Sequence, residues 1–218
     1  MPASTRTHAS DVAFTRSVKS VQARKGSRNA YARMEENGSW QTRITPELAS
    51  FIEAQSSVFL ATTNLDGQPY IQHRGGPAGF LRVLDDRLIG FVDFTGNRQY
   101  ITLGNLVDNP KACLFLMDYA HRRRVKIWGE ARVVEGDADL TEKLMLQGYR
   151  ARAEQVILFT ISAWDANCSQ HIPQRFDAAD VAAALAERDK RIRVMEAEIE
   201  RLRHLPSAPS GALGGSAA

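Results

Sequence analysis

Residues 90–106 read GFVDFTGNRQYITLGNL, a stretch that combines an apolar strand, a turn of small residues and the start of a helix. Thr95, Gly96 and Asn97 form the turn, and Arg98 follows directly. A helix N-terminus presents unpaired N–H groups and the positive end of the helix dipole, so it suits a phosphate group. Gly96 would let the backbone approach that group closely, and Arg98 would add a charged, planar donor. The stretch predicts a phosphate-binding turn, with a helix beginning at or just after Asn97.

Short strands with hairpin-scale spacing surround this turn. Thr45 and Pro46 predict the N-terminus of a helix over 45–55, because Thr caps helix ends and Pro suits the first helical position. The other predicted elements are strands at 58–63, 69–74, 79–84, 88–92, 112–117, 123–134 and 155–164, and helices near 98–107 and over 137–149. Many short strands with few helices are typical of an antiparallel barrel. We therefore predict a mainly β (α+β) fold, a barrel with flanking helices.

Cationic side chains stand near the ends of the predicted strands. Arg74 closes the second strand. Arg122, Arg124 and Lys126 alternate along the start of a later strand, so they share one face of it. These cations could converge on one dianionic group. The alternative is a charged edge strand, which protects a sheet from pairing with another chain.

The order of these features resembles a known family. A strand ending in Arg74 is followed by FVDFTGNRQ, a short helix ending in Asn-Pro, a KACLFLM strand and then RRVKIWGEARVV. This order, over residues 45–175, is similar to the FMN-binding split barrel of pyridoxamine 5'-phosphate oxidase and its relatives. The strings DFTGNRQYITLGNL and AWDANCSQHIPQRF resemble a subgroup described as flavin-nucleotide-binding proteins. The resemblance implies an antiparallel split β-barrel, FMN as cofactor, and a homodimer whose cofactor sites use both subunits.

The resemblance also implies which residues hold the flavin. Arg74 would contact the phosphate or groups near it, and Arg98 with its neighbours would bind the phosphate itself. Gln99 replaces a lysine of the oxidase, which removes one positive charge. Arg124 replaces a glutamine that reaches the flavin, where a cation would favour the anionic reduced form. The predicted cofactor-binding residues are Arg74, Gly75, Gly76, Val92, Asp93, Thr95, Asn97, Arg98, Gln99, Arg124, Lys126 and Trp164.

The segment after the last strand, residues 164–173, supplies the remaining candidates. Trp164 could stack near the flavin, and His171 is the candidate catalytic residue, as a proton donor or a phosphate contact. Cys168 and His171 have C-x-x-H spacing, but a zinc site needs a second pair of ligands, so we expect no metal. The Arg-x-His substrate motif of the oxidase is not evident, so pyridoxamine phosphate is not the expected substrate.

These features favour an FMN-dependent oxidoreductase that transfers electrons or hydride to or from a small molecule. The alternatives are a deazaflavin-dependent reductase of the same fold, a non-catalytic flavin or haem binder, and a nucleic-acid-binding protein. The last would need a groove-reading helix or interleaved aromatic residues, so nucleic acid is not an expected partner. No apolar run approaches the ~20 residues of a membrane span. The chain has only two cysteines, which fits a cytoplasmic protein without a disulfide framework.

The N-terminal residues 1–40 differ in charge from the predicted barrel at 41–176. Seven Lys or Arg residues stand against one acid, Asp11, among residues 1–34. Such a basic arm could touch nucleic acid or an anionic surface, and it also resembles an organelle transit peptide. The simpler interpretation is a solvated arm, partly helical or disordered.

The C-terminal residues 177–205 are predicted to form a charged, coiled-coil-like helix. Leu185, Ile192 and Ile199 recur every seven positions, as in a coiled-coil seam. The same spacing would suit a helix packed on the barrel by its apolar stripe, and the sequence leaves both arrangements open. Residues 206–218 are rich in Pro, Gly, Ser and Ala, and we predict a flexible tail.

Overall fold

The computed structural model describes residues 8–38, 40–167 and 170–204. The predicted tail and Cys168 lie outside the described residues. The chain divides into two compact units, residues 1–174 and 175–218. Within the described part, no helix is both long and apolar enough to cross a membrane.

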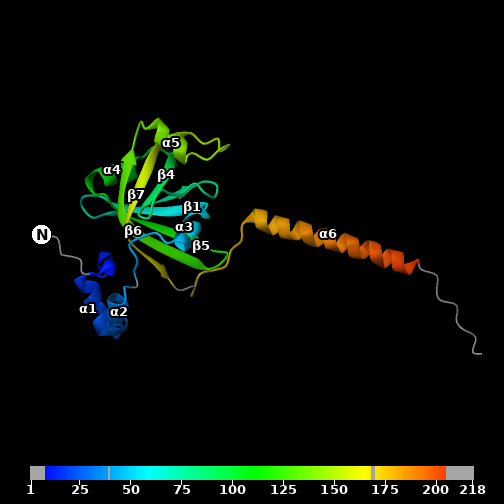
Figure 1. Ribbon diagram of the computed structural model, residues 1–218, viewed down its shortest axis with the longest axis horizontal. Coiled ribbons are helices and arrows are strands. Elements are labelled where there is room, and N and C mark those ends of the chain that lie inside the picture. The colour runs from blue at the N-terminus through cyan, green and yellow to red at the C-terminus, as the bar shows by residue number, and fades with distance from the viewer. Residues whose placement is uncertain (1–7, 39, 168–169, 205–218) are drawn as a thin grey trace, which may run out of the picture. The chain divides into compact units, whose positions relative to one another are not determined.

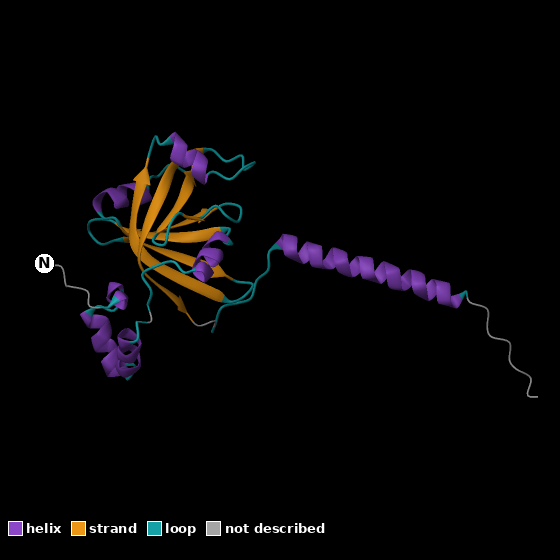
Figure 2. Ribbon diagram, viewed as in Figure 1, coloured by secondary structure: helices purple, strands orange, loops and turns teal. Residues whose placement is uncertain are grey.

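Seven antiparallel strands form one sheet that curls into a barrel (Figures 1 and 2). The strands are β1 (Ser57–Thr63), β2 (Pro69–Gly75), β3 (Arg82–Val83), β4 (Leu88–Phe94), β5 (Lys111–Asp118), β6 (Arg123–Val134) and β7 (Ala153–Asn167). They pair in the order β2-β1-β5-β6-β7-β4-β3, which leaves β2 and β3 as the edges. The barrel is therefore split between these two edges, and the predicted antiparallel split barrel is confirmed.

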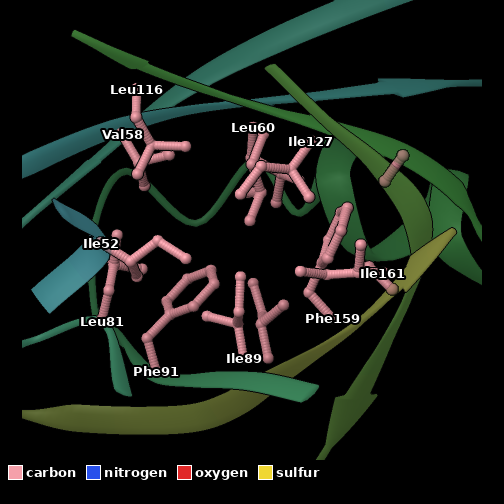
Figure 3. Packing of buried hydrophobic residues seen from close by; sticks show 14 of the residues in the cluster. Ile52, Val58, Leu60, Leu81, Ile89, Phe91, Leu116, Ile127, Phe159 and Ile161 are labelled. Carbon is pink, nitrogen blue, oxygen red and sulfur yellow. The ribbon is translucent and has the colours of Figure 1, made fainter. Parts of the chain in front are cut away.

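The barrel interior is filled by apolar side chains that alternate along the strands. In β1 every second residue is buried, as in a half-buried strand. Leu60, Phe91, Ile127 and Phe159 come from four different strands and point into one core (Figure 3). Ile52 joins them from helix α3 (Pro46–Glu53). Period-two alternation thus builds a closed core from strands distant in sequence.

The two longest strands, β6 and β7, are bent by a bulge at Trp128 and Gly129. A Cβ atom on Gly129 would lie 2.1 Å from the carbonyl oxygen of Thr160. Only glycine fits such a close backbone approach. The extra residue, Ser162, lies in β7, and the bulge lets this strand curve around the core, as closure of a sheet requires.

Helices α3, α4 (Ile101–Asp108) and α5 (Ala138–Leu144) flank the barrel. The predicted Thr45 cap of α3 is confirmed, because its Oγ1 accepts a hydrogen bond from the N–H of Leu48 at 3.2 Å. Helix α5 is shorter than the predicted 137–149, since the chain becomes extended at Met145 and Gly148 has a φ of 76°. Both positions are incompatible with a continuing helix.

The described part of the basic arm folds into η1 (Ala9–Val12), α1 (Arg16–Lys25) and α2 (Arg28–Glu36). These helices meet at Glu35, whose side chain is only 3% exposed. Its carboxylate forms ion pairs with Lys19 at 3.2 Å and with Arg28, and it accepts a hydrogen bond from the Ser10 hydroxyl at 3.2 Å. Burial raises the pKa of Glu35, but the hydrogen bonds from Arg28 and Lys19 outweigh burial, so the pKa lies below its ordinary value.

The second unit contains α6 (Ala178–Arg203), a single helix of 26 residues. None of its residues is buried. Its apolar side chains, which include Leu185, Ile192 and Ile199, are between 43% and 64% exposed.

Candidate functional site

A groove of about 190 Å³ opens at the split of the barrel. Its walls come from β2, the end of β4, the loop before α4, the first turn of α4 and the start of β7. This volume is smaller than the ~300–1,000 Å³ typical of complete small-molecule sites. The predicted site residues that line this groove are Arg74, Asp93, Asn97, Arg98 and Gln99.

An ion pair between Arg74 and Asp93 bridges the two edges of the sheet. Nε of Arg74 lies 2.6 Å from Oδ1 of Asp93, and Nη2 donates a hydrogen bond to Oδ2 at 3.3 Å. The shorter contact is an ion pair without hydrogen-bond alignment. Gln155 Nε2 donates to Asp93 Oδ2 at 2.9 Å from the neighbouring strand β7. Because β3 pairs β4 only at residues 89 and 90, this polar cluster closes the barrel where the sheet has no further hydrogen bonds.

The loop between β4 and α4 does not have the predicted conformation. The prediction that a helix begins at or just after Asn97 is wrong, because α4 begins at Ile101. Arg98 and Tyr100 have φ angles of 58° and 54°, which a right-handed helix cannot accommodate. The side chain of Asn97 instead accepts a hydrogen bond from the N–H of Gln99 at 3.3 Å. The segment is a shaped loop rather than a helix N-terminus, so phosphate binding here would rely on side chains and loop backbone.

Arg98 is the exposed cation of this loop. Its Nε donates a hydrogen bond to the Tyr100 hydroxyl at 3.0 Å, and that hydroxyl donates to Glu154 at 2.7 Å. The hydrogen bond to Tyr100, and then the nearby charge of Glu154, raise the pKa of Arg98 above its ordinary value. Arg98 therefore stays charged at physiological pH, and its two Nη groups remain available to a ligand.

The groove is nearly balanced in charge. Two cations, Arg74 and Arg98, face two anions, Asp93 and Glu154, among its lining residues. Arg74 is 17% exposed and its charge is already paired with Asp93. A bound phosphate would therefore depend mainly on Arg98.

A second group of predicted residues, Arg124, Lys126 and Trp164, lies elsewhere in the same chain. Lys126 pairs with Asp165 in the register of β6 and β7, and Arg124 with Asn167. Residues 155 and 165 are ten positions apart on β7, at most about 33 Å along the strand. Within one protomer, the structure does not bring this group to the groove.

Alternation along β6 places Arg124, Lys126 and Trp128 on the face opposite the core, as predicted for Arg124 and Lys126. The prediction is wrong for Arg122, which precedes β6 and has a φ of 53°. Nε of Arg124 is buried and has no hydrogen-bond partner among the described residues. A buried donor of this kind is costly unless a ligand or solvent pairs with it. Trp128 stacks on Trp40 with ring centroids 4.8 Å apart, so the N-terminal arm packs against this face.

Three other predicted residues contribute differently from the prediction. The Val92 side chain packs in a core cluster with Leu144 and Val156, so only its backbone could face a ligand. A Cβ on Gly76 would lie 2.8 Å from Phe80, which explains this glycine by packing. The N–H of Thr95 donates to the carbonyl of Arg152 at 3.0 Å.

Gly75 and His171 stand outside the groove lining. A Cβ on Gly75 would lie 2.9 Å from the His73 ring. His171 is exposed, has a φ of 62°, and follows β7 at the end distant from Gln155. Among the described residues, no three His, Cys, Asp or Glu side chains gather as a metal site.

Sequence reasoning missed several residues of the groove. Tyr70 and Gln72 line it together with Arg74, and the two-residue period of β2 could have revealed them. Tyr100, Glu154 and Gln155 also line it, and their position depends on strand pairing between β4 and β7. That pairing carries no local sequence signal.

The family model of pyridoxamine 5'-phosphate oxidase matches residues 44–168, more than half of the chain. The chain belongs to the pyridoxamine 5'-phosphate oxidase family. The matched range includes the groove and the second group of candidates on β6 and β7, whereas His171 and α6 lie beyond it. None of the curated proteins matches the chain.

Solved structures with detectable similarity include several proteins of about barrel size. HupZ of Group A Streptococcus is 23% identical, with 61% of this chain and 99% of HupZ covered and a TM-score of 0.46. A Clostridium acetobutylicum protein related to general stress protein 26, of the pyridoxinephosphate oxidase family, is 17% identical over 62% of this chain and 94% of its own, with a TM-score of 0.42. An FMN-binding protein of Syntrophomonas wolfei is 11% identical over 67% and 97%, with a TM-score of 0.43.

Proposed function

We propose that this member of the pyridoxamine 5'-phosphate oxidase family is a cytoplasmic FMN-binding flavoprotein that works as a homodimer. Its bound flavin would exchange electrons or hydride with a small molecule. One observation carries the proposal: in a chain of this family, the split of the barrel forms an open groove beside an exposed, permanently charged arginine.

The loop at residues 96–100 would hold the phosphate of FMN. Arg98 is exposed and uses only Nε within the loop, so its Nη groups can form the paired hydrogen bonds that suit phosphate oxygens. Asn97 and Gln99 add amide groups at the same rim. Arg74 and Asp93 would form the floor and hold the two sheet edges at the spacing the ligand needs.

The partner subunit would complete each site with its second group of residues. Arg124, Lys126 and Trp164 cannot reach the groove of their own chain, which suits a site shared between protomers. The buried, unpaired Nε of Arg124 fits this role, because a polar ligand atom would satisfy it. A cation beside the flavin ring would also stabilise negative charge on it.

FMN would supply the redox chemistry itself, since the flavin ring accepts and donates electrons or hydride. The chain's own residues would bind the phosphate, position the ring and restrict access of water. None of the motifs described above identifies the small molecule.

Absorbance of the purified protein tests the cofactor directly. We expect visible flavin bands, and FMN identified by mass after heat release. A colourless protein that also takes up no added FMN would reject the proposal, and a released deazaflavin would assign the same groove to a reductase of that class.

Arginine variants test the phosphate contact. Arg98→Ala is expected to weaken FMN binding by ~10- to 100-fold, the range for losing a charge-assisted hydrogen bond. Arg98→Lys should weaken it less, because it keeps the charge but loses the planar fork. Arg132→Ala is the matched control, because Arg132 is an exposed arginine of β6 outside the groove lining. Equal affinities for all three variants and the parent would contradict the assignment.

A further inference from the structure

Helix α6 displays an apolar stripe that no residue of the described chain buries. Val181, Leu185, Ile192, Met195 and Ile199 are 43%, 50%, 43%, 62% and 47% exposed. Most helical stability in proteins comes from packing an apolar face rather than from intrinsic propensity. We therefore expect the apolar stripe to pack against a partner surface of similar length.

The spacing of the stripe identifies the kind of partner. Leu185, Ile192 and Ile199 occupy successive a positions of a heptad repeat. Val181, Met195 and Leu202 occupy d positions, and Arg188 takes the remaining one. Apart from Val194 at a c position, the large apolar residues of the helix occupy a and d, which form the narrow seam of a coiled coil. A helix with the same repeat covers such a seam best. A second copy of α6 supplies that repeat.

The charges beside the seam favour a parallel pair. In a parallel dimer, each g residue faces the e residue five positions later on the other helix. Arg191 at g would then face Glu196 of the partner subunit, and Glu198 would face Arg203 of the partner subunit. Both contacts, each formed twice, join opposite charges. In an antiparallel pair, a residues pack against d residues, e residues face e residues and g residues face g residues. Asp189 would then face Glu196 of the partner subunit, and only the contact of Arg191 with Glu198 of the partner subunit would join opposite charges.

Arg188 is the exception in the seam. Its long aliphatic stem can cover apolar surface while the guanidinium reaches solvent beside Asp189, at some cost in stability. A single charged layer of this kind limits the affinity and fixes the alignment of the two helices, as polar seam residues do in other coiled coils.

From these observations we infer that α6 pairs with α6 of a second copy of this chain as a parallel, in-register, two-stranded coiled coil. This contact joins protomers through the C-terminal unit. It requires no flavin, and so stands apart from the cofactor site proposed above.

Cysteine cross-linking in the full-length chain tests both the pairing and its direction. The background is Cys113→Ala with Cys168→Ala, and single variants are Leu185→Cys and Leu202→Cys on the seam and Lys190→Cys on the outer face. In a parallel pair, equal seam residues face each other, so mild oxidation should link 185 to 185 and 202 to 202 at least about tenfold faster than 190 to 190. Equal rates at the three positions, or no links at all, would overturn the inference.

Two further experiments test the relative direction of the two helices and the proposed charge pairs. In a mixture of the two seam variants, dominant links between residues 185 and 202 would mean an antiparallel pair and overturn the parallel assignment. In the Leu185→Cys chain, Arg191→Glu should slow linking several-fold, and adding Glu196→Arg should restore it. A slow double variant would contradict the proposed charge pairs.

The FMN content of the same samples separates this inference from the proposed function. Flavin-loaded protein without seam-specific links overturns only the coiled coil. Seam-specific links in a protein that takes up no FMN support the coiled coil and reject the flavin site.

Discussion

At the scale of single residues, the most consequential contact is the one between Arg74 and Asp93. It joins β2 to β4 directly across the split of the barrel, although β1, β5, β6 and β7 lie between them in the order of the sheet. Buried ion pairs add little over well-packed apolar residues, but losing one partner leaves an uncompensated charge. The ion pair of Arg74 and Asp93 therefore matters more for the geometry of the groove than for overall stability.

We expect Asp93→Asn to lower the free energy of unfolding by ~3 kcal/mol, since it leaves Arg74 buried without a counter-charge. Denaturant unfolding measures this loss. The double variant Arg74→Met, Asp93→Leu should lose less than either single change, because no unpaired charge remains. Additive losses would show that the two side chains do not interact.

Cys113 gives a second residue-scale prediction. Burial raises the pKa of its thiol to about 11, although the nearby charge of Lys126 opposes the shift. Only the thiolate reacts, so at pH 8 about a thousandth of the Cys113 population would be reactive. Alkylation followed by peptide mapping should show slow labelling of Cys113 in the native protein and rapid labelling in denaturant. Fast native labelling at pH 8 would contradict this placement.

At the scale of elements, the basic arm is organised around one buried acid, Glu35, while Asp11 also pairs with Lys19 at 2.7 Å. Most of its cations remain exposed, but Lys19 and Arg28 converge on the buried carboxylate of Glu35. Residues 1–34 contain one acid, Asp11, and Glu35 follows directly. Charge composition therefore does not distinguish a solvated arm from a packed one. The three helices form a unit because one ionised carboxylate satisfies two cations and a hydroxyl.

Glu35→Gln is expected to destabilise this helical unit by ~1–3 kcal/mol, because it removes the charge that pairs with Lys19 and Arg28. Hydrogen exchange of α1 and α2 would report the loss as faster local opening. Glu36→Gln is the matched control, since Glu36 is the exposed neighbour.

The same unit should respond to pH. The folded-state pKa of Glu35 is depressed from 4.5, so its contribution is present above that pH and is lost as the pH falls through the lower folded value. Exchange in α1 should accelerate in this acidic window in the parent protein. An equally strong response in Glu35→Gln would rule out Glu35 as the titrating group.

At the scale of the whole molecule, the candidate residues fall into two groups that one chain keeps apart. The first group lies around Arg98 in the groove. The second group includes Arg124 of β6, which pairs with Asn167 at the other end of β7. Two copies of the chain could bring unlike groups together. The proposed homodimer therefore has consequences for mixtures of variants.

Subunit mixing tests this arrangement. Arg98→Ala chains and Arg124→Ala chains should each retain little FMN alone. After the two are unfolded and refolded together, half of the dimers are mixed and each has one intact site, so about a quarter of the parent FMN content should return. No recovery, with both variants folded by circular dichroism, would place each site within a single chain.

Local sequence patterns determined most of the elements of this protein. Most strands follow from composition and turn signals, although the predicted strand at 79–84 is reduced to β3, Arg82–Val83. The start of α3 follows from the Thr45 cap, and the face shared by Arg124 and Lys126 follows from the two-residue period. These features depend on neighbours within a few positions along the chain, so residue identity suffices to predict them.

Only the tertiary structure decided which of these residues meet. Alternation tells which face of a strand a side chain occupies, but it carries no information on pairing between strands far apart in sequence. Closure of the sheet brings Arg74 to Asp93 and Gln155, while the register of β6 with β7 takes Lys126 to the opposite end. The left-handed backbone angles of Arg98 and Tyr100 were likewise outside local rules, and the Tyr100 hydroxyl bonds to Glu154 of β7, which is distant in sequence. Long-range packing, which sums many weak contacts across the core, therefore determined the groove.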